Sequence, residues 1–370
     1  MRIAVIGKKF PFCGIVTYCR ELVRTMRARG HEVAFFYLHE EEVHFEREEG
    51  LPYLFKTHMY TIPMPDTRAR LADSLRAFAP DVVHASFALS PLDFALPEVC
   101  RELGVPLVAT FHVALDHRPS LPNHVSGFVY RMYASTLAKC GRVIIFSELQ
   151  RAKLARLGVP AGRIDVVPNG VDVQRWSPGP SRFKAAIGAT HVVGYMGRLD
   201  PEKNVGALLE AFTQASLPPN THLAIVGDGV LGARLRRKHA DVPNVHWLGF
   251  IQDEDERRDI LRGCDVFALP SSVEGLSIAL LEGMACGAAP LATDVGADGE
   301  VIQGVGRVID PTRLPEELAP ALTALLADPD ELARLREASR RRVVTRYSAQ
   351  QNASALLEVY AAAGRAVAAS

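Results

Sequence analysis

The chain has 370 residues, with 42 basic and 42 acidic side chains and a formal net charge of zero at pH 7. Zero net charge argues against a nucleic-acid-binding protein, because the phosphate backbone is bound by concentrated Lys and Arg. With 48% hydrophobic and 23% charged residues, the composition is that of a folded globular protein and not of a disordered one. The length predicts two domains.

Targeting signals and disulfides are not evident in the sequence. No apolar run approaches the roughly 18–20 residues of a membrane span. The opening MRIAVIG has the pattern of a strand and not that of a signal peptide. The six cysteines contain no CxxC pair, so we expect reduced, mostly buried thiols. The sequence therefore predicts a cytoplasmic protein without a transmembrane segment.

Short β-branched runs alternate with helical patterns through the first half of the chain. Apolar strands separated by helices indicate a parallel sheet that is buried on both faces, and thus a doubly wound α/β domain. Gly30 is expected to end the first helix. The strands predicted in this half are 2–6, 32–37, 82–86, 107–111, 142–147 and 164–168.

A segment rich in Pro, Gly and Ser (168–181) interrupts this alternation and is interpreted as a linker. The predicted domains are 1–175 and 176–345, with a C-terminal helix (346–370) that packs back on the first domain. Two Rossmann-like domains would face each other across a cleft, where doubly wound proteins bind ligands at the carboxyl ends of their strands. The strands predicted after the linker are 191–197, 222–227, 244–249, 265–270 and 288–293.

The segment SSVEGLSIALLEGMACGAAP (271–290) follows a predicted buried strand and opens a helix. Ser277 is a suitable N-cap and Gly287 a suitable end of this helix. The backbone N–H groups of Gly275, Leu276 and Ser277 are therefore expected to be unpaired and to point into the cleft. A helix N-terminus of this kind binds phosphate through its free N–H groups and the positive end of its dipole.

Two carboxylates, Glu274 and Glu282, lie at the start of this helix and one to two turns inside it. Carboxylates accept hydrogen bonds from hydroxyls, so this spacing suits a ligand with sugar hydroxyls at both ends and phosphates between them. The alternative is that Glu274 only faces the helix dipole and that Glu282 is an ordinary surface residue.

A second constellation, YMGRLDPEKN (195–204), also lies where a strand gives way to a helix. Arg198 offers a planar guanidinium and Lys203 a mobile point charge, and such a pair suits a diphosphate. The alternative is that both are solvated charges balanced by Asp200 and Glu202.

Two further patterns imitate known sites. GDGVLG (227–232) matches GxGxxG, but the acidic residue that should follow at the end of the next strand is missing, which argues against a nicotinamide cofactor. DED (253–255) imitates a metal-binding pair, although it precedes a helical run and is better explained as N-terminal capping. We therefore expect no catalytic metal.

Taken together, these segments resemble the retaining family-4 glycosyltransferases, which have the GT-B fold. The similarity extends over nearly the whole chain, and its segments occur in the order known for that family. They are PFCGIVTYCREL (11–22), TFH (110–112), PNGVD (168–172), GRLDPEKN (197–204), VGDG (226–229), LGFI (248–251), the E-x7-E pair and ALLEGMACGAAPLATDVG (279–296).

The resemblance implies a role for each matching position in the second domain. Arg198 and Lys203 would neutralise the diphosphate of a sugar donor, as metal ions do in other transferases. Glu274 would bind hydroxyls of the donor sugar with help from the backbone amides of residues 275–277. Glu282 would hold the ribose of the nucleotide.

The remaining positions follow in the same way. Ile251 would meet the base through its backbone, and Gly197 would belong to the donor-binding loop. His112 would stand beside the sugar near the reacting carbon, and Gly14 would let a loop of the first domain approach donor and acceptor. The catalytic set implied by the resemblance is His112, Arg198, Lys203 and Glu274. The family often has paired glycines where this chain has Cys13-Gly14 and Gly296-Ala297.

The activity implied is that of a retaining, metal-independent glycosyltransferase that moves a hexose-type sugar from a nucleotide diphosphate sugar to an acceptor hydroxyl. No cofactor is expected beyond this co-substrate, and the sequence does not distinguish UDP, GDP and ADP donors. The acceptor could be a saccharide, a lipid or a small molecule. Two alternatives stay open: a sugar-nucleotide epimerase of the same fold, and a non-catalytic nucleotide-sugar-binding protein.

Peripheral contact with the inner face of a membrane also stays open, through the stretch FVYRMYASTLAK (128–139), which mixes aromatic and basic residues. A helix with one face in the core explains the same pattern better.

Overall fold

The computed structural model divides into two compact units. Unit 1 comprises Met1–Gly170 together with Ala349–Ser370, and unit 2 comprises Val171–Ser348. The sequence placed the corresponding boundaries after residues 175 and 345. The residues that the structure describes are 1–9, 13–40, 43–45, 47–56, 61–87, 89–114 and 121–368. Residues 11 and 12 of the segment PFCGIVTYCREL lie outside them.

The sheet of unit 1 contains nine strands within the described residues. Those predicted from apolar runs are β1 (Arg2–Gly7), β2 (Glu32–His39), β6 (Val82–Phe87), β7 (Leu107–Phe111), β8 (Arg142–Ile145) and β9 (Ile164–Val166). Three were not predicted, namely β3 (Val43–Phe45), β4 (Glu48–Lys56) and β5 (Thr61–Pro63). The order is β3-β4-β2-β1-β6-β7-β8-β9, with β5 paired to β4. The strands from β4 to β9 run parallel, whereas β3 and β5 are antiparallel to β4.

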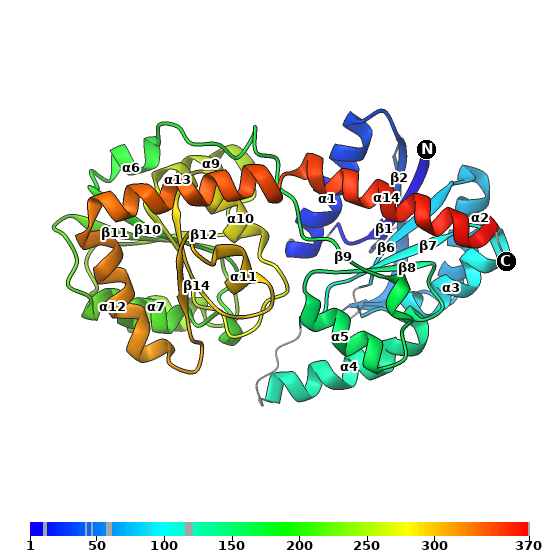
Figure 1. Cartoon of the computed structure of the whole chain (residues 1–370), viewed down its shortest axis with the longest axis horizontal. Coiled ribbons are helices and arrows are strands. Elements are labelled where there is room, and N and C mark those ends of the chain that lie inside the picture. Colours follow the sequence, from blue (N-terminus) through cyan, green and yellow to red (C-terminus); the bar gives the residue numbers. More distant parts are fainter. Residues whose placement is uncertain are drawn as a thin grey trace. The chain divides into compact units, whose positions relative to one another are not determined.

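Helices cover this sheet, and the C-terminal helix is one of them. Gly30, with φ +80°, follows the first helix as the sequence predicted. Figure 1 shows α14, in red, lying along unit 1, where it contacts α1, β7 and β8. The helices are α1 (Gly14–Ala28), α2 (Thr67–Phe78), α3 (Pro91–Leu103), α4 (Leu121–Leu137), α5 (Glu148–Arg156) and α14 (Ala349–Ala368).

A buried polar network ties α14 to the core of unit 1. The hydroxyl of Tyr360 on α14 lies 2.5 Å from Nδ1 of His84 on β6. His84 Nε2 lies 2.7 Å from Oγ1 of Thr110 on β7, and the hydroxyl of Tyr18 on α1 lies 3.0 Å from the same oxygen. Burial lowers the pKa of His84 to about 3, so its imidazole is neutral at pH 7. Such a satisfied network specifies one position for α14.

Unit 2, which the structure describes in full, is built on a six-stranded, entirely parallel sheet. Its strands are β10 (His191–Met196), β11 (Thr221–Val226), β12 (Val245–Gly249), β13 (Val266–Leu269), β14 (Ala289–Thr293) and β15 (Arg307–Ile309). The order is β12-β11-β10-β13-β14-β15, which is that of a dinucleotide-binding doubly wound sheet. The sequence predicted all but β15, which has three residues of which only Ile309 is buried.

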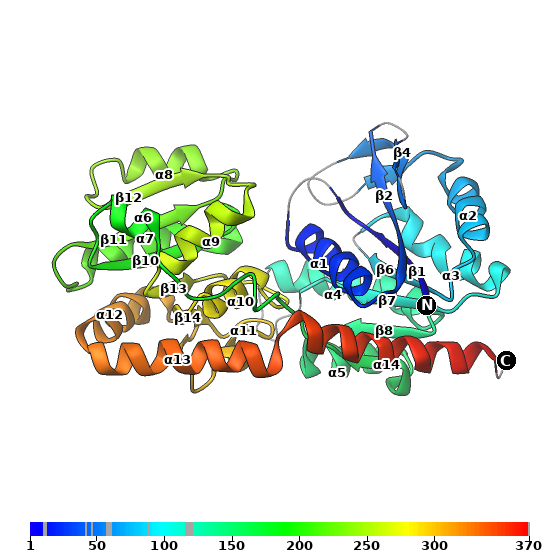
Figure 2. The same ribbon diagram turned by 90° about the horizontal axis from the view of Figure 1, so that it is seen from above.

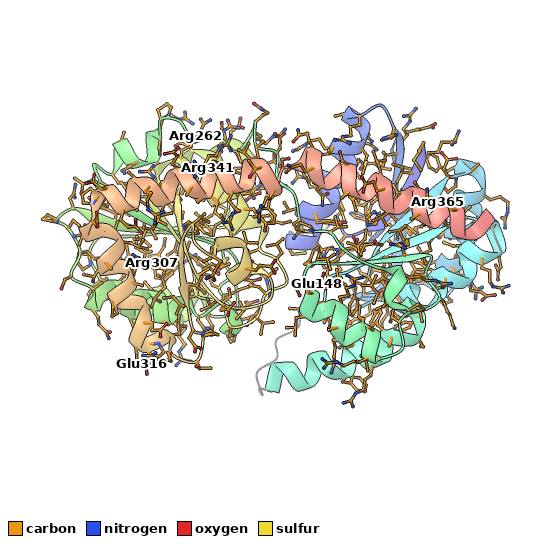
Figure 3. The ribbon with its side chains drawn as sticks, in the orientation of Figure 1. Glu148, Arg262, Arg307, Glu316, Arg341 and Arg365 are labelled. Carbon is orange, nitrogen blue, oxygen red and sulfur yellow. The ribbon has the colours of Figure 1, made fainter. Side chains whose placement is uncertain are left out.

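The helices of unit 2 lie over both faces of this sheet (Figure 2). Asp253 caps α9 by accepting a hydrogen bond from the backbone N–H of Glu256 at 2.8 Å, as predicted for the DED segment. Exposed charged side chains cover the surface of both units, and those labelled in Figure 3 include Glu148, Arg307, Glu316, Arg341 and Arg365. The helices are α6 (Arg182–Ala186), α7 (Val205–Gln214), α8 (Gly232–Lys238), α9 (Glu254–Gly263), α10 (Ile278–Ala285), α11 (Asp298–Ile302), α12 (Leu314–Ala327) and α13 (Pro329–Arg346).

Three features of the chain bear on its cellular location: the stretch 128–139, the length of its apolar helices and the state of its cysteines. Helix α4 buries Tyr130 and Tyr133 in the core, while Phe128 is 65% and Met132 39% exposed, so one face of the stretch 128–139 is a core face. None of the helices in the described ranges is long and apolar enough to cross a membrane. The six cysteines, all within those ranges, are free thiols, and all but Cys13 are buried.

Candidate functional site

The predicted site residues of unit 2 gather at one edge of its sheet. Because all six strands are parallel, their carboxyl ends lie at the same edge. The strand order reverses between β10 and β13, and open α/β sheets bind ligands at such a switch point. Arg198 and Lys203 follow β10, and Glu274 follows β13, so the two predicted constellations flank the switch point.

The side chains of Lys203 and Glu274 form an ion pair across this switch point. Lys203 Nζ lies 2.6 Å from Glu274 Oε1, and the hydroxyl of Ser271 donates to the same oxygen at 2.8 Å. The two charged side chains are only 14% and 13% exposed. Glu274 is therefore more than a partner of the helix dipole, and Lys203 is balanced by Glu274 and not by Glu202.

Hydrogen bonds to backbone carbonyls hold the two loops of this ion pair together. The N–H of Ser272 donates to the carbonyl of Glu202 at 2.7 Å, and the side-chain amide of Asn204 donates to the carbonyl of Pro270 at 3.0 Å. Asn204 has φ +49°, a left-handed conformation that asparagine tolerates better than most residues. The geometry around Lys203 and Glu274 is thus set by the backbone and not by the ion pair alone.

Arg198 is placed differently from Lys203. Its guanidinium is bonded to Asp200 and to Oε1 of Glu202, the latter at 2.7 Å, and its side chain is 54% exposed. The alternative interpretation, a solvated charge balanced by Asp200 and Glu202, describes Arg198 in this structure. A role toward a diphosphate requires the guanidinium to exchange these carboxylates for phosphate oxygens.

Two glycines at this edge are required by close packing. A Cβ on Gly197 would lie 2.8 Å from the hydroxyl of the buried Tyr195, which donates to the carbonyl of Arg198 at 2.6 Å. Gly227 has φ +133°, and a Cβ there would lie 1.8 Å from the carbonyl oxygen of Gly197. The approach of the loop after β11 to the loop after β10 therefore accounts for the first glycine of GDGVLG without a dinucleotide.

Helix α10 begins and ends as predicted, but one of its N–H groups is not free. Ser277 caps the helix by accepting from the N–H of Leu280 at 3.3 Å, and Gly287 follows its end with φ +90°. The N–H of Ser277, however, donates to Oδ1 of Asp298 at 2.8 Å. The prediction of three unpaired N–H groups at residues 275–277 is therefore wrong for Ser277.

Glu282 and Ile251 are both buried. Glu282 is 3% exposed, and its Oε2 lies 4.0 Å from Nη1 of Arg257, which is 4% exposed. The interpretation of Glu282 as a surface residue is wrong. Ile251 is 7% exposed and follows β12.

Unit 1 carries the other two predicted residues. Gly14 is the exposed first residue of α1, and a Cβ there would meet nothing within 4 Å, so packing within unit 1 does not require glycine. His112 directly follows β7, with its ring centroid 4.9 Å from that of Tyr18. Its Nε2 is buried and has no hydrogen-bond partner within the described part of the chain, which is uncommon for a core histidine. Burial, together with His84 and Lys8, lowers the pKa of His112 to about 3, so the ring is neutral.

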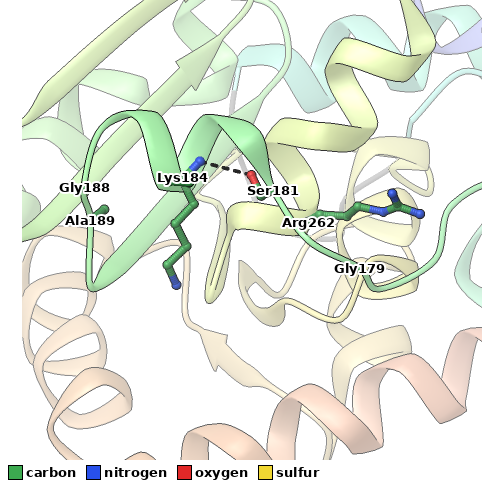
Figure 4. A pocket seen from close by; sticks show the side chains of 7 residues that line it. Gly179, Ser181, Lys184, Gly188, Ala189 and Arg262 are labelled. Atoms are coloured by element: carbon green, nitrogen blue, oxygen red, sulfur yellow. Dashed lines mark hydrogen bonds between the residues drawn. The ribbon is translucent and has the colours of Figure 1, made fainter.

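A cavity of about 490 Å³ in unit 2 lies apart from these residues (Figure 4). Lys184 and Arg262, which line it, are engaged with other groups. Lys184 Nζ lies 2.6 Å from Asp265 Oδ2, and Arg262 donates to the carbonyl of Ser177 at 2.8 Å. Across the described chain, no three His, Cys, Asp or Glu side chains are grouped so that they could hold a metal ion.

Family models match both halves of the chain. The model described as Glycosyltransferase Family 4 matches residues 12–175, and that of Glycosyl transferases group 1 matches residues 181–342.

Among curated proteins, a glycogen synthase of Mycobacterium tuberculosis is 30% identical over 299 residues, which is 78% of this chain and 70% of that protein. A GDP-mannose-dependent phosphatidylinositol monomannoside mannosyltransferase of Corynebacterium glutamicum is 27% identical over 368 residues, which is 93% of this chain and 93% of that protein.

Solved structures share the fold over the whole chain. Anabaena HepE in complex with UDP and glucose has a TM-score of 0.79 at 18% identity, covering 98% of this chain and 99% of that one. A sucrose-phosphate synthase of Thermosynechococcus elongatus has a TM-score of 0.77 at 21% identity, and both chains are covered to 100%.

Proposed function

Because the chain belongs to glycosyltransferase family 4 and has the GT-B fold, we propose that it is a retaining, metal-independent enzyme that transfers a hexose-type sugar. It is a glycosyltransferase that uses a nucleotide-sugar donor. The donor is a nucleotide diphosphate sugar, and the acceptor supplies a hydroxyl. The observation that carries the proposal is the Lys203–Glu274 ion pair, which flanks the switch point of the unit 2 sheet.

This ion pair supplies both charges that a donor of this class needs. In the proposed complex, the ammonium of Lys203 turns to the diphosphate, joined by the guanidinium of Arg198. The carboxylate of Glu274 then accepts hydrogen bonds from hydroxyls of the donor sugar. The backbone bonds between the two loops keep the charges in place before the donor binds, and preorganised charge is the most effective way to stabilise a leaving group.

The proposed reaction exchanges one bond at the anomeric carbon of the donor sugar. The bond between the anomeric carbon and the phosphate oxygen breaks, and the acceptor oxygen forms its bond to the same carbon on the same face of the sugar. The acceptor proton passes to the leaving phosphate. Lys203 and Arg198 stabilise the negative charge that grows on the diphosphate, in the place that a metal ion takes in other transferases. His112, being neutral, hydrogen-bonds the sugar through Nε2.

Turnover of α-linked UDP-, GDP- and ADP-sugars tests this proposal. We expect one nucleotide class to release nucleoside diphosphate when a polyol or saccharide acceptor is present, with equal rates in EDTA and in Mg²⁺. Proton NMR should show an α-linked product, and hydrolysis without acceptor should be slow. A β-linked product or loss of activity in EDTA would contradict the proposal, and conversion of the donor to its epimer without acceptor would identify an epimerase.

A further inference from the structure

Asp298 follows β14, at the edge of the unit 2 sheet where the sugar donor is proposed to bind. The reaction proposed above does not use this residue. It is the first residue of α11 and is 0% exposed. Its Oδ1 accepts the N–H of Ser277 at 2.8 Å, whereas its Oδ2 is buried and has no hydrogen-bond partner among the residues that the structure describes. A buried carboxylate usually has all its oxygens satisfied, so the second oxygen requires an explanation.

The loop that carries Asp298 is pressed against the segment that carries Glu274. The N–H of Ala297 donates to the carbonyl of Gly275 at 2.8 Å. Gly296 has φ +58°, and a Cβ there would lie 2.2 Å from the carbonyl oxygen of Glu274. Residues 294–298 therefore pack against residues 274–277. Asp298 holds the second segment at Ser277, the residue that caps the start of α10.

An ionised Asp298 would repel the donor diphosphate that is proposed to bind at this edge of the sheet. The charged groups that face it are Glu274 and Lys203, while Asp294 and Glu300 of its own segment are exposed. When Lys203 turns to a diphosphate, Glu274 loses its cation. An ionised Asp298 would then add a further negative charge beside Glu274 and the phosphates. It would also occupy the positive end of α10 that favours an anion.

We propose that Asp298 is a positioning residue of the donor site, which holds the Ser277 N–H as a neutral carboxylic acid and so orders the 274–277 segment without opposing the donor diphosphate. This inference rests on the proposed function. Burial and the charge of Glu274 raise the pKa of Asp298 well above its ordinary value, while the Ser277 N–H and Lys203 act in the opposite direction. The Oδ2–H of the neutral acid is a donor that a bound sugar or phosphate oxygen satisfies.

Replacing Asp298 by asparagine or by alanine distinguishes a neutral carboxylic acid from an ionised carboxylate. Asp298→Asn keeps an oxygen for the Ser277 N–H and a donor in place of Oδ2–H, whereas Asp298→Ala keeps neither. The affinity of the full chain for whichever of UDP, GDP or ADP binds the wild type is measured by titration calorimetry in EDTA.

We expect Asp298→Asn to bind within about twofold of the wild type at pH values at which Asp298 keeps its proton, and relatively better as the pH rises and the wild type loses that proton. Asp298→Ala should bind about tenfold more weakly throughout, because a buried N–H is left unpaired. Equal weakening in both variants would overturn the proposal.

The unliganded protein gives a readout that does not depend on the donor. A carboxyl whose pKa is raised by folding contributes most below the ordinary carboxyl pKa of about 4, and this contribution is lost as the pH rises toward the raised value. As the pH rises above about 4, the melting temperature of Asp298→Asn should therefore increase relative to that of the wild type. Asp330→Asn, an exposed carboxylate in the first turn of α13, is the matched control and should show no such trend.

A constant difference between Asp298→Asn and the wild type would contradict the neutral acid. If no nucleoside diphosphate binds the wild type, the proposed function fails, while the melting temperatures still decide the protonation of Asp298.

Discussion

Replacing Lys203 by alanine is expected to lower kcat/KM for the sugar donor by about 10²–10³-fold, the effect of removing one preorganised group from a developing anion. The Lys203 side chain is 14% exposed, so water replaces its charge poorly. The change also leaves the carboxylate of Glu274 without its cation, which adds repulsion toward the diphosphate. Steady-state kinetics with saturating acceptor measures the loss.

Lys238→Ala is the matched control for this experiment. Lys238 Nζ lies 2.6 Å from Glu210 Oε1, the same separation as in the Lys203–Glu274 pair, but these side chains are 56% and 53% exposed. Exposed pairs of this kind contribute little, so kcat/KM should stay within about twofold of the wild type. A loss below about tenfold in Lys203→Ala, which is about 1.4 kcal/mol, would exclude a role for Lys203 toward the leaving group.

Replacing Asp265 by alanine is expected to lower the stability of unit 2 by about 3 kcal/mol. Its side chain is 5% exposed and accepts hydrogen bonds from Lys184 at 2.6 Å, from Arg336 at 2.8 Å and from the N–H of Val192 at 2.9 Å. These partners come from α6, α13 and β10, so the carboxylate joins three elements. Lys184 and Arg336 are 26% and 37% exposed, which keeps the loss near the lower end for buried pairs.

Tryptophan fluorescence follows this loss in unit 2, because both tryptophans of the chain, Trp176 and Trp247, belong to it. Asp255→Ala is the control, since Asp255 pairs with Arg258 at 3.0 Å but is 75% exposed. We expect it to cost less than about 1 kcal/mol. Equal shifts of the unfolding midpoint in the two variants would refute the role assigned to Asp265.

The sequence predicted the central strands because their residues are apolar on both faces. It missed β4 because Glu48–Lys56 mixes charges, a proline and aromatic residues, a composition tolerated only near the edge of a sheet. It also missed β15, whose three residues, Arg307–Ile309, are too few to show a pattern.

Part of the candidate site could also be predicted from the sequence. Lys203 and Glu274 are 71 residues apart, but each follows a strand with a recognisable pattern, and the parallel order brings those strands together. The bond from Ser277 to Asp298 had no comparable signal. It depends on the left-handed Gly296 and on a loop packed against the 274–277 segment, neither of which follows from periodicity. The ion pairs of Arg198 were correctly given as an alternative, because its partners Asp200 and Glu202 are neighbours in the sequence.

The most direct test of the donor site is the thermal stability of the wild type and of Lys203→Ala with UDP, GDP, ADP and NAD, each in EDTA and in Mg²⁺. A ligand at about 100 times its Kd stabilises the folded state by about 2.7 kcal/mol. We expect one nucleoside diphosphate to raise the melting temperature of the wild type equally in EDTA and in Mg²⁺, and to have little effect on Lys203→Ala. Stabilisation by NAD alone, a requirement for Mg²⁺, or an unchanged response in Lys203→Ala would contradict a diphosphate site built on Lys203.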